Sequence, residues 1–241
     1  AAWFYSNVDI VLVPSRYYMD DLEKMGISRD RMELFPRGTD CTLFSPDWRS
    51  DEFILRYGGS PESMKLLYAG RISREKDLDI LSKAFMIARR TMPDLELYLA
   101  GDGPFRGDLV NQLSGKGCYF CGVLHGEDLS RAYASCDIFV FPSSTDTYGN
   151  SVLEAQASGL PAIVCDMGGP KEIIETGKTG LVFESHDPES LADTILTIAM
   201  NKELKDRMGI NARKMAISRT WEKAFDKLWS ISPDSFKQVK V

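Results

Sequence analysis

Short apolar runs recur along the chain from Lys65 onward, each bounded by polar or glycine-rich residues. Runs of this length between turn signals predict buried strands, and they cover residues 66–69, 95–100, 119–123, 138–141, 162–165 and 181–183. Between them apolar positions recur with the helical period, which predicts helices over about 77–91, 104–114, 127–135, 150–158 and 170–176.

Three more helices are expected after the last predicted strand. Asp187-Pro188-Glu189 combines an N-cap, a proline in the first turn and an acid, so it opens a helix that runs to about Met200. Two further helical patterns cover 202–217 and 220–230. Strands alternating with helices predict an α/β fold, a Rossmann-like parallel sheet with helices on both faces. Ligands bind such sheets beyond the carboxyl ends of the strands, so the loops after the strands are the candidate sites.

The first 44 residues follow a different pattern. An apolar run over 9–14, a helix that starts at Ser15 and ends at Gly26, and a second run over 32–36 form one strand–helix–strand unit. One such unit cannot bury both of its faces. We therefore expect residues 1–44 to be the remnant of a preceding domain with its linker, and 45–241 to be the Rossmann-like domain. The stretch 37–61 is rich in turn residues and reads as linker.

Composition narrows the function without defining it. The 241 residues carry a net charge of −6, which argues against a nucleic-acid partner. No apolar run approaches the roughly 20 residues of a membrane-spanning helix. Cys118 and Cys121 form a C-x-x-C, but no second ligand pair follows, so we expect no metal site. Five reduced cysteines fit a cytoplasmic protein.

Three loops after predicted strands carry candidate chemistry. In Gly70-Arg71-Ile72-Ser73-Arg74-Glu75-Lys76 the cations Arg71 and Lys76 suit a diphosphate, although a solvated charged turn would read the same. The acids of Asp77-Leu78-Asp79 are typical of a helix first turn. Gly101-Asp102-Gly103 is not the dinucleotide fingerprint, because its third glycine is one place late. The backbone around Gly122 and Val123 is a candidate contact for a nucleobase.

The loop and helix from Ser143 to Pro161 form the most informative stretch. Its helix is built of small and apolar residues with one acid, Glu154, and a buried unpaired carboxylate is costly. A ligand hydroxyl or a protein cation would compensate it. Gly149 directly precedes the helix, whose first amides are a seat for a phosphate or sugar oxygen. Asp146 supplies a second acid on the same side. The glycines of Gly168-Gly169-Pro170 permit close backbone approach.

These motifs, in this order, resemble the retaining glycosyltransferases of family 4, which have the GT-B fold. Asp146-x7-Glu154 with Ala155-x-Ala157-Ser158-Gly159-Leu160-Pro161 is similar to the E-x7-E region, and Gly70-Arg71-x4-Lys76 is similar to the cationic pair. Gly101-Asp102-Gly103-Pro104, Gly168-Gly169-Pro170-Lys171-Glu172 and Pro36-Arg37-Gly38-Thr39-Asp40 also match. The chain departs from the pattern at Asp146, where the family usually has Glu, and this bears on the identity of the sugar.

The resemblance implies a role for each matched position. Arg71 and Lys76 would hold the diphosphate of a UDP- or GDP-linked sugar, Glu154 the ribose and Asp146 the transferred hexose. Amides of Tyr148, Gly149, Asn150, Ser151 and Val152 would contact sugar and phosphate, with no metal and no other cofactor. The chain would then be the C-terminal, donor-binding half of a hexosyltransferase. Its acceptor, a glycan or a lipid, would be held by an N-terminal half, and the resemblance leaves open peripheral association with the inner face of a membrane.

Two other functions share this architecture. One is a regulatory module that binds a nucleotide sugar without catalysis, and it would stay inactive after the N-terminal half is supplied. The other is a non-hydrolysing epimerase, which would interconvert UDP-sugars without an acceptor.

Overall fold

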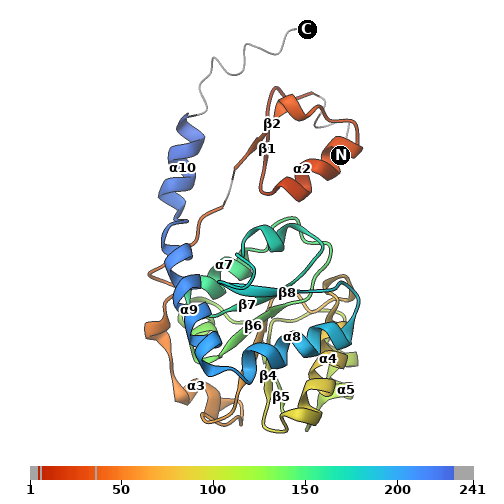
Figure 1. Cartoon of the computed structure of the whole chain (residues 1–241), viewed down its shortest axis with the longest axis vertical. Helices are drawn as coiled ribbons and strands as arrows, with labels where there is room; N and C mark the ends of the chain where they lie inside the picture. Colours follow the sequence, from red (N-terminus) through yellow and green to blue (C-terminus); the bar gives the residue numbers. More distant parts are fainter. Residues whose placement is uncertain (1–4, 6, 36, 231–241) are drawn as a thin grey trace.

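A six-stranded parallel sheet forms the centre of the molecule (Figure 1). The computed structural model describes residues 5, 7–35 and 37–230. The strands are β3 (Lys65–Ala69), β4 (Glu96–Ala100), β5 (Cys118–Gly122), β6 (Ile138–Phe141), β7 (Ala162–Cys165) and β8 (Gly180–Phe183). Their spatial order is β5-β4-β3-β6-β7-β8, which is the doubly wound order of a Rossmann-like sheet. The predicted fold class is confirmed.

Helices pack on both faces of this sheet (Figure 1). On one face α4 (Leu78–Thr91) contacts α5 (Arg106–Leu113) and α8 (Pro188–Ala199). On the other, α6 (Gly126–Ser135) packs against α3 (Asp51–Arg56) and α7 (Asn150–Ala157), and α7 packs against α9 (Lys202–Ile217). All residues of β3, β4, β6 and β7 are buried, as expected for strands covered on both sides.

The strand order fixes where a ligand can bind. β3 and β6 are hydrogen-bonded neighbours, with Leu66 opposite Ile138 and Leu67 opposite Phe139. The chain leaves β3 toward β4 on one side and leaves β6 toward β7 on the other. The two loops therefore diverge at the carboxyl edge of the sheet and leave a crevice between them. These are the loops that carry Arg71 and Lys76 on one side and Asp146 on the other.

The N-terminal residues form a small separate unit. β1 (Val11–Val13) and β2 (Met32–Leu34) pair in parallel around α2 (Arg16–Lys24). A cluster of Val11, Val13, Met19, Leu22, Ile27 and Met32 is distinct from the main core. The chain then crosses to the main sheet beside α10 (Trp221–Ser230), where Thr39 pairs with Thr220 and Phe35 meets Phe225 at 6.4 Å between ring centroids.

Two local predictions are wrong. The stretch 37–61 contains a short 3-10 helix, Pro46–Trp48, and the helix α3, because Ser50 caps α3 and Phe53 and Ile54 bury its apolar side. The helix expected over 170–176 is only a 3-10 turn, η4 (Gly169–Glu172), because Gly168 at φ +86 and Pro170 set a tight turn. Pro36 and residues 231–241, which the predictions also covered, lie outside the described residues.

Candidate functional site

A pocket of about 730 Å³ lies at the carboxyl edge of the sheet, at the point where the loops after β3 and β6 diverge. Loops after β3, β4, β5 and β6 and the first turns of α7 form its walls. Most of the residues singled out in the sequence line it, namely Arg71, Lys76, Val123, Asp146, Tyr148, Gly149, Asn150, Ser151 and Glu154. Segments far apart in the sequence thus meet in one crevice.

A tight ion pair lines the pocket. Lys76 Nζ contacts Asp146 Oδ1 at 2.8 Å and Oδ2 at 2.9 Å, and both side chains are about one-fifth exposed. Arg71 is 67% exposed, and its guanidinium lies 3.9 Å from Glu75 Oε1. At that distance and exposure the Arg71 contact is weak, so its guanidinium remains available to a ligand. An anion entering here would meet two cations.

The N-terminus of α7 forms a second wall. Gly149 adopts the left-handed conformation at φ +95, which glycine tolerates and which turns the chain into the helix. No side chain in the described part of the chain caps α7. The first amides of a helix lack intrahelical acceptors, and Asn150 and Ser151 at this end line the pocket. The helix therefore presents donors and a partial positive charge to whatever binds.

Among the residues that the structure describes, no cation pairs with Glu154. The Tyr133 hydroxyl of α6 donates a hydrogen bond to Glu154 Oε2 at 2.8 Å. Burial raises the pKa of Glu154 above its usual 4.5, and the Tyr133 hydrogen bond opposes that rise. A carboxylate with one satisfied oxygen and a cavity beside it can accept hydrogen bonds from ligand hydroxyls.

The raised pKa of Glu154 predicts how stability changes with pH. The folded state holds the proton more tightly than the unfolded state, so stability falls as pH rises from the usual 4.5 through the folded pKa. Glu154→Gln removes this loss while keeping an acceptor for Tyr133. We expect urea unfolding between about pH 4 and about pH 8 to show the glutamine variant gaining stability relative to the parent as pH rises. A difference that does not change with pH would contradict this assignment.

Two predicted site residues do not line the pocket. Val152 has a fully buried side chain, and its amide donates to Gly149 O at 3.0 Å, closing the first turn of α7. Gly122 uses its carbonyl to accept from Gly101 N at 2.7 Å. Both positions instead hold the loops that form the walls. Of the predicted residues next to them, Val123, Asn150 and Ser151 line the pocket.

Several lining residues were missed in the sequence. Tyr68, near the end of β3, is fully buried and donates to Arg71 O at 2.8 Å, so it fixes the turn that carries the cations. A tyrosine within an otherwise apolar strand was a usable signal. Tyr133 gave none, because nothing in the helical pattern of α6 shows that it reaches α7. The other lining positions that were absent from the predicted site are Arg37, Ala69, Gly70, Glu75, Ala100, Gly101, Asp102, Leu124, Leu129, Phe141 and Thr147.

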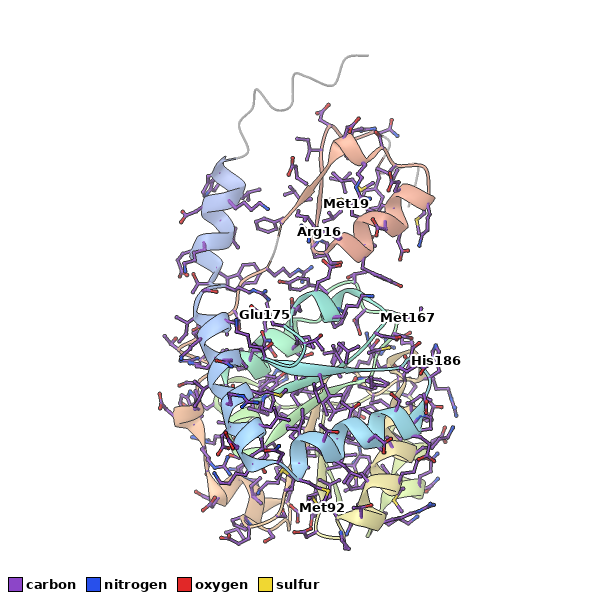
Figure 2. All side chains as sticks on the ribbon, in the orientation of Figure 1. Arg16, Met19, Met92, Met167, Glu175 and His186 are labelled. Atoms are coloured by element: carbon purple, nitrogen blue, oxygen red, sulfur yellow. The ribbon has the colours of Figure 1, made fainter. Side chains whose placement is uncertain are left out.

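The turn at Gly168-Gly169 packs against the loop that carries Asp146. Gly169 N donates to Asp146 O at 2.8 Å, and a Cβ on Gly169 would lie 2.0 Å from Thr147 O. On the other side of this turn, Glu172 accepts from the first two amides of α2, Arg16 N at 2.9 Å and Tyr17 N at 2.7 Å. Figure 2 shows Arg16 at the edge of the small unit that faces the main sheet. Glu172 thus serves as a cap rather than as part of the pocket.

Within residues 5, 7–35 and 37–230, no three His, Cys, Asp or Glu side chains are grouped so that they could hold a metal ion. The cysteines Cys118 and Cys121 are free thiols. No helix of the same residues has the length and apolar character needed to cross a bilayer.

Comparison with known proteins identifies the family. The model of the glycosyl transferases group 1 matches residues 52–215. The chain is 35% identical to a sulfoquinovosyl transferase of Arabidopsis thaliana over 94% of its length, and 35% identical to a GDP-mannose-dependent alpha-mannosyltransferase of Mycolicibacterium smegmatis over 95%. The chain therefore belongs to the group 1 glycosyl transferases. It spans 44% and 59% of these two relatives, about half of their length.

Solved structures give the same fold. HepE of Anabaena, in complex with UDP and glucose, matches with a TM-score of 0.80 at 21% identity, covering 92% of this chain and 63% of that one. Sucrose-phosphate synthase of Thermosynechococcus elongatus matches with a TM-score of 0.81 at 25% identity, covering 96% of this chain and 61% of that one. The architecture is that of one half of a GT-B glycosyltransferase.

Proposed function

We propose that this chain is the donor-binding half of a retaining hexosyltransferase and that its pocket holds a UDP- or GDP-linked hexose. One observation carries the proposal: the cations Arg71 and Lys76, the carboxylates Asp146 and Glu154 and the uncapped N-terminus of α7 line a single pocket of about 730 Å³. Each group matches one part of a nucleotide sugar. Cations suit the diphosphate, and carboxylates suit hydroxyls of the ribose and the sugar.

Each group that lines the pocket is assigned to one part of the donor. Glu154, held by Tyr133, accepts the ribose hydroxyls. Arg71 and Lys76 bind the diphosphate, with the amides of Asn150 and Ser151 beside them. Asp146, in contact with Lys76, accepts hydroxyls of the hexose. Val123 and the backbone around it, which also line the pocket, are assigned to the nucleobase.

This arrangement suits transfer from a diphosphate leaving group. When the bond to the sugar breaks, negative charge grows on the diphosphate, and fixed cations and helix-end amides stabilise that charge. The Asp146 carboxylate, which pairs with Lys76 at 2.8 Å, would stabilise the developing positive charge on the sugar. In the proposed retaining reaction the leaving phosphate assists deprotonation of the acceptor on the same face, so the mechanism requires no protein base.

The named relatives support the type of donor. The mannosyltransferase of M. smegmatis is named as GDP-mannose-dependent, and HepE is described with UDP and glucose. We propose that the acceptor, a glycan or a lipid, is bound by the portion of the relatives that this chain does not span. Residues 1–44 would then be the end of that acceptor-binding half and the linker, and membrane association would be a property of the longer protein.

Calorimetric titration tests the proposal directly. We expect the 241-residue chain to bind UDP or GDP, and to bind the cognate nucleotide sugar, without added metal. Titrating matched pairs of UDP- and GDP-sugars identifies base and sugar. Absence of affinity for any nucleoside diphosphate in the folded chain would refute the proposal. Formation of an epimer from a UDP-sugar without acceptor would favour the epimerase instead.

A further inference from the structure

Asp77 adopts an unusual backbone conformation next to the pocket. Within the described part of the chain, Asp77 at φ +52 and His186 at φ +60 are the non-glycine residues with positive φ. The two touch, since His186 Nδ1 lies 3.8 Å from Asp77 Oδ1, and His186 is labelled in Figure 2. The left-handed region is disfavoured for side-chain-bearing residues, although Asp tolerates it better than most. Such a conformation persists where the surroundings hold it in place.

The carboxylate of Asp77 holds the loop that carries Asp146. Its Oδ2 accepts from Ser144 N at 2.8 Å and from Ser144 Oγ at 2.7 Å. Ser144 is 5% exposed and the Asp77 side chain 17%, so these bonds are largely shielded from water. Hydrogen bonds to an ionised acceptor are about twice as strong as neutral ones. Asp77 is therefore a strong anchor for the start of this loop, yet it does not line the pocket.

The same residue directly follows Lys76. It lies at the junction between the 3-10 turn Arg74–Lys76 and α4. The 3-10 turn and the loop that carries Asp146 contact each other through three adjacent residues on each side. Thr145 Oγ1 donates to Glu75 O at 3.2 Å, Lys76 pairs with Asp146, and Asp77 accepts from Ser144. Of these contacts, the one at Asp77 is the least exposed, with Ser144 at 5% and the Asp77 side chain at 17%.

Two simpler explanations of the acids in Asp77-Leu78-Asp79, a helix cap and a metal site, do not account for this geometry. Asp77 makes no side-chain capping bond to α4, although it occupies the cap position. Asp79 faces Lys83, with 3.6 Å between Oδ2 and Nζ, so the two acids of the motif serve different partners. Neither belongs to a group of metal-ligating side chains among the residues described.

We propose that Asp77 is a positioning residue for the diphosphate end of the donor pocket. By holding Ser144, it sets the separation of Lys76 and Asp146, and thereby the place where the β-phosphate contacts Lys76. The nucleoside end, formed by Glu154 and Tyr133, is anchored by α6 and α7 and does not depend on Asp77. This inference rests on the proposed function, because it assigns a role within that same pocket.

The test compares UDP with UMP, which lacks the β-phosphate, in calorimetric titrations of four proteins. Asp77→Gly keeps the left-handed backbone and removes the carboxylate. We expect it to weaken UDP binding about tenfold while UMP binding stays within about twofold. Asp77→Asn keeps an acceptor for Ser144 and tolerates the same backbone, so UDP binding should return to within about threefold of the parent. Asp79→Asn, the matched control in the same motif, should bind both nucleotides like the parent.

The outcomes separate this inference from the proposed function. If the parent chain binds UDP but Asp77→Gly weakens UDP and UMP equally, or weakens neither, Asp77 is not a positioning residue. An asparagine variant that behaves like the glycine variant overturns the inference as well. Failure of the parent chain to bind either UDP or GDP would instead contradict the proposed function itself, and a parent chain that binds GDP alone is tested with GDP and GMP in place of UDP and UMP.

Discussion

Replacing Arg71 and Lys76 together with alanine is expected to abolish nucleoside diphosphate binding. Each cation offers charge-assisted contacts to a phosphate oxygen, worth about 1.5–3 kcal/mol apiece. Loss of both should lower the affinity for UDP or GDP by about 10²–10⁴-fold. Calorimetry with a millimolar ligand should then detect no binding. The fold should survive, since Arg71 is 67% exposed and neither side chain belongs to the core.

A double variant with the same change in charge is the control. Arg74 lies between the two cations in sequence, yet it pairs with Asp108 at 2.5 Å and does not line the pocket. Lys83 pairs with Asp79 on α4. Arg74→Ala with Lys83→Ala should therefore bind the nucleotide like the parent. Equal losses in the two double variants would show that net charge, rather than the pocket, attracts the ligand.

The single variants should not be equivalent. Lys76→Ala removes the cation that pairs with the Asp146 carboxylate, whereas Arg71→Ala only removes an attraction for the diphosphate. We therefore expect Lys76→Ala to cost more UDP affinity. Adding Asp146→Asn to Lys76→Ala should recover part of the loss, because it removes the repulsion between carboxylate and phosphate. No recovery would mean that Asp146 lies too far from the diphosphate to repel it.

Gly101→Ala is expected to be the most destabilising single change near the pocket. A Cβ at Gly101 would lie 1.9 Å from Gly70 O, and its φ of +143 is unfavourable for alanine. The loops after β3 and β4 are joined here, with Gly70 N donating to Ala100 O at 2.9 Å and Ile72 N to Asp102 O at 2.9 Å. Forcing them apart should cost about 2–4 kcal/mol in the free energy of unfolding, measured in urea.

Gly107→Ala provides the matched comparison. Gly107 lies in α5, and nothing surrounds the position that a Cβ would occupy within 4 Å. Alanine in a helix is favoured over glycine, so this variant should be unchanged or more stable by about 0.5–1 kcal/mol. Similar losses in both variants would rule out the close approach of Gly101 to Gly70 as the cause.

The sequence defined most of the fold because a buried parallel sheet leaves a strong pattern. Continuous apolar strands such as β3 and β6, separated by helical periods, have few alternative readings. The misses came from short elements. The helix α3 has a cap at Ser50 and acids at Asp51 and Glu52, signals that were present but lay inside a turn-rich stretch. The helix expected over 170–176 did not form, although Ile173 and Ile174 are apolar, because Gly168 and Pro170 set a tight turn at η4.

The pocket residues that follow the ends of strands could be predicted from the sequence, whereas the contact between two helices that also lines the pocket could not. Arg71, Lys76 and Asp146 follow strands that must end at the same edge, so their convergence follows from topology. The partner of Glu154 did not follow, because Tyr133 reaches it from another helix and the sequence holds no record of how α6 and α7 are rotated. The same limit hid the Asp77–Ser144 bonds, which depend on a backbone conformation that no residue pattern reveals.

The short turn that contains Glu172 connects the small N-terminal unit to the loop that carries Asp146. Its carboxylate holds the start of α2, Ser15 Oγ donates to Thr147 O at 2.5 Å, and Gly169 rests on Asp146 O. A rotation of the small unit that displaces these atoms by more than the length of a hydrogen bond must break these contacts or move the residues that flank Asp146. By linkage, a ligand of the pocket that favours one conformation of this loop also favours one orientation of the small unit relative to the main sheet.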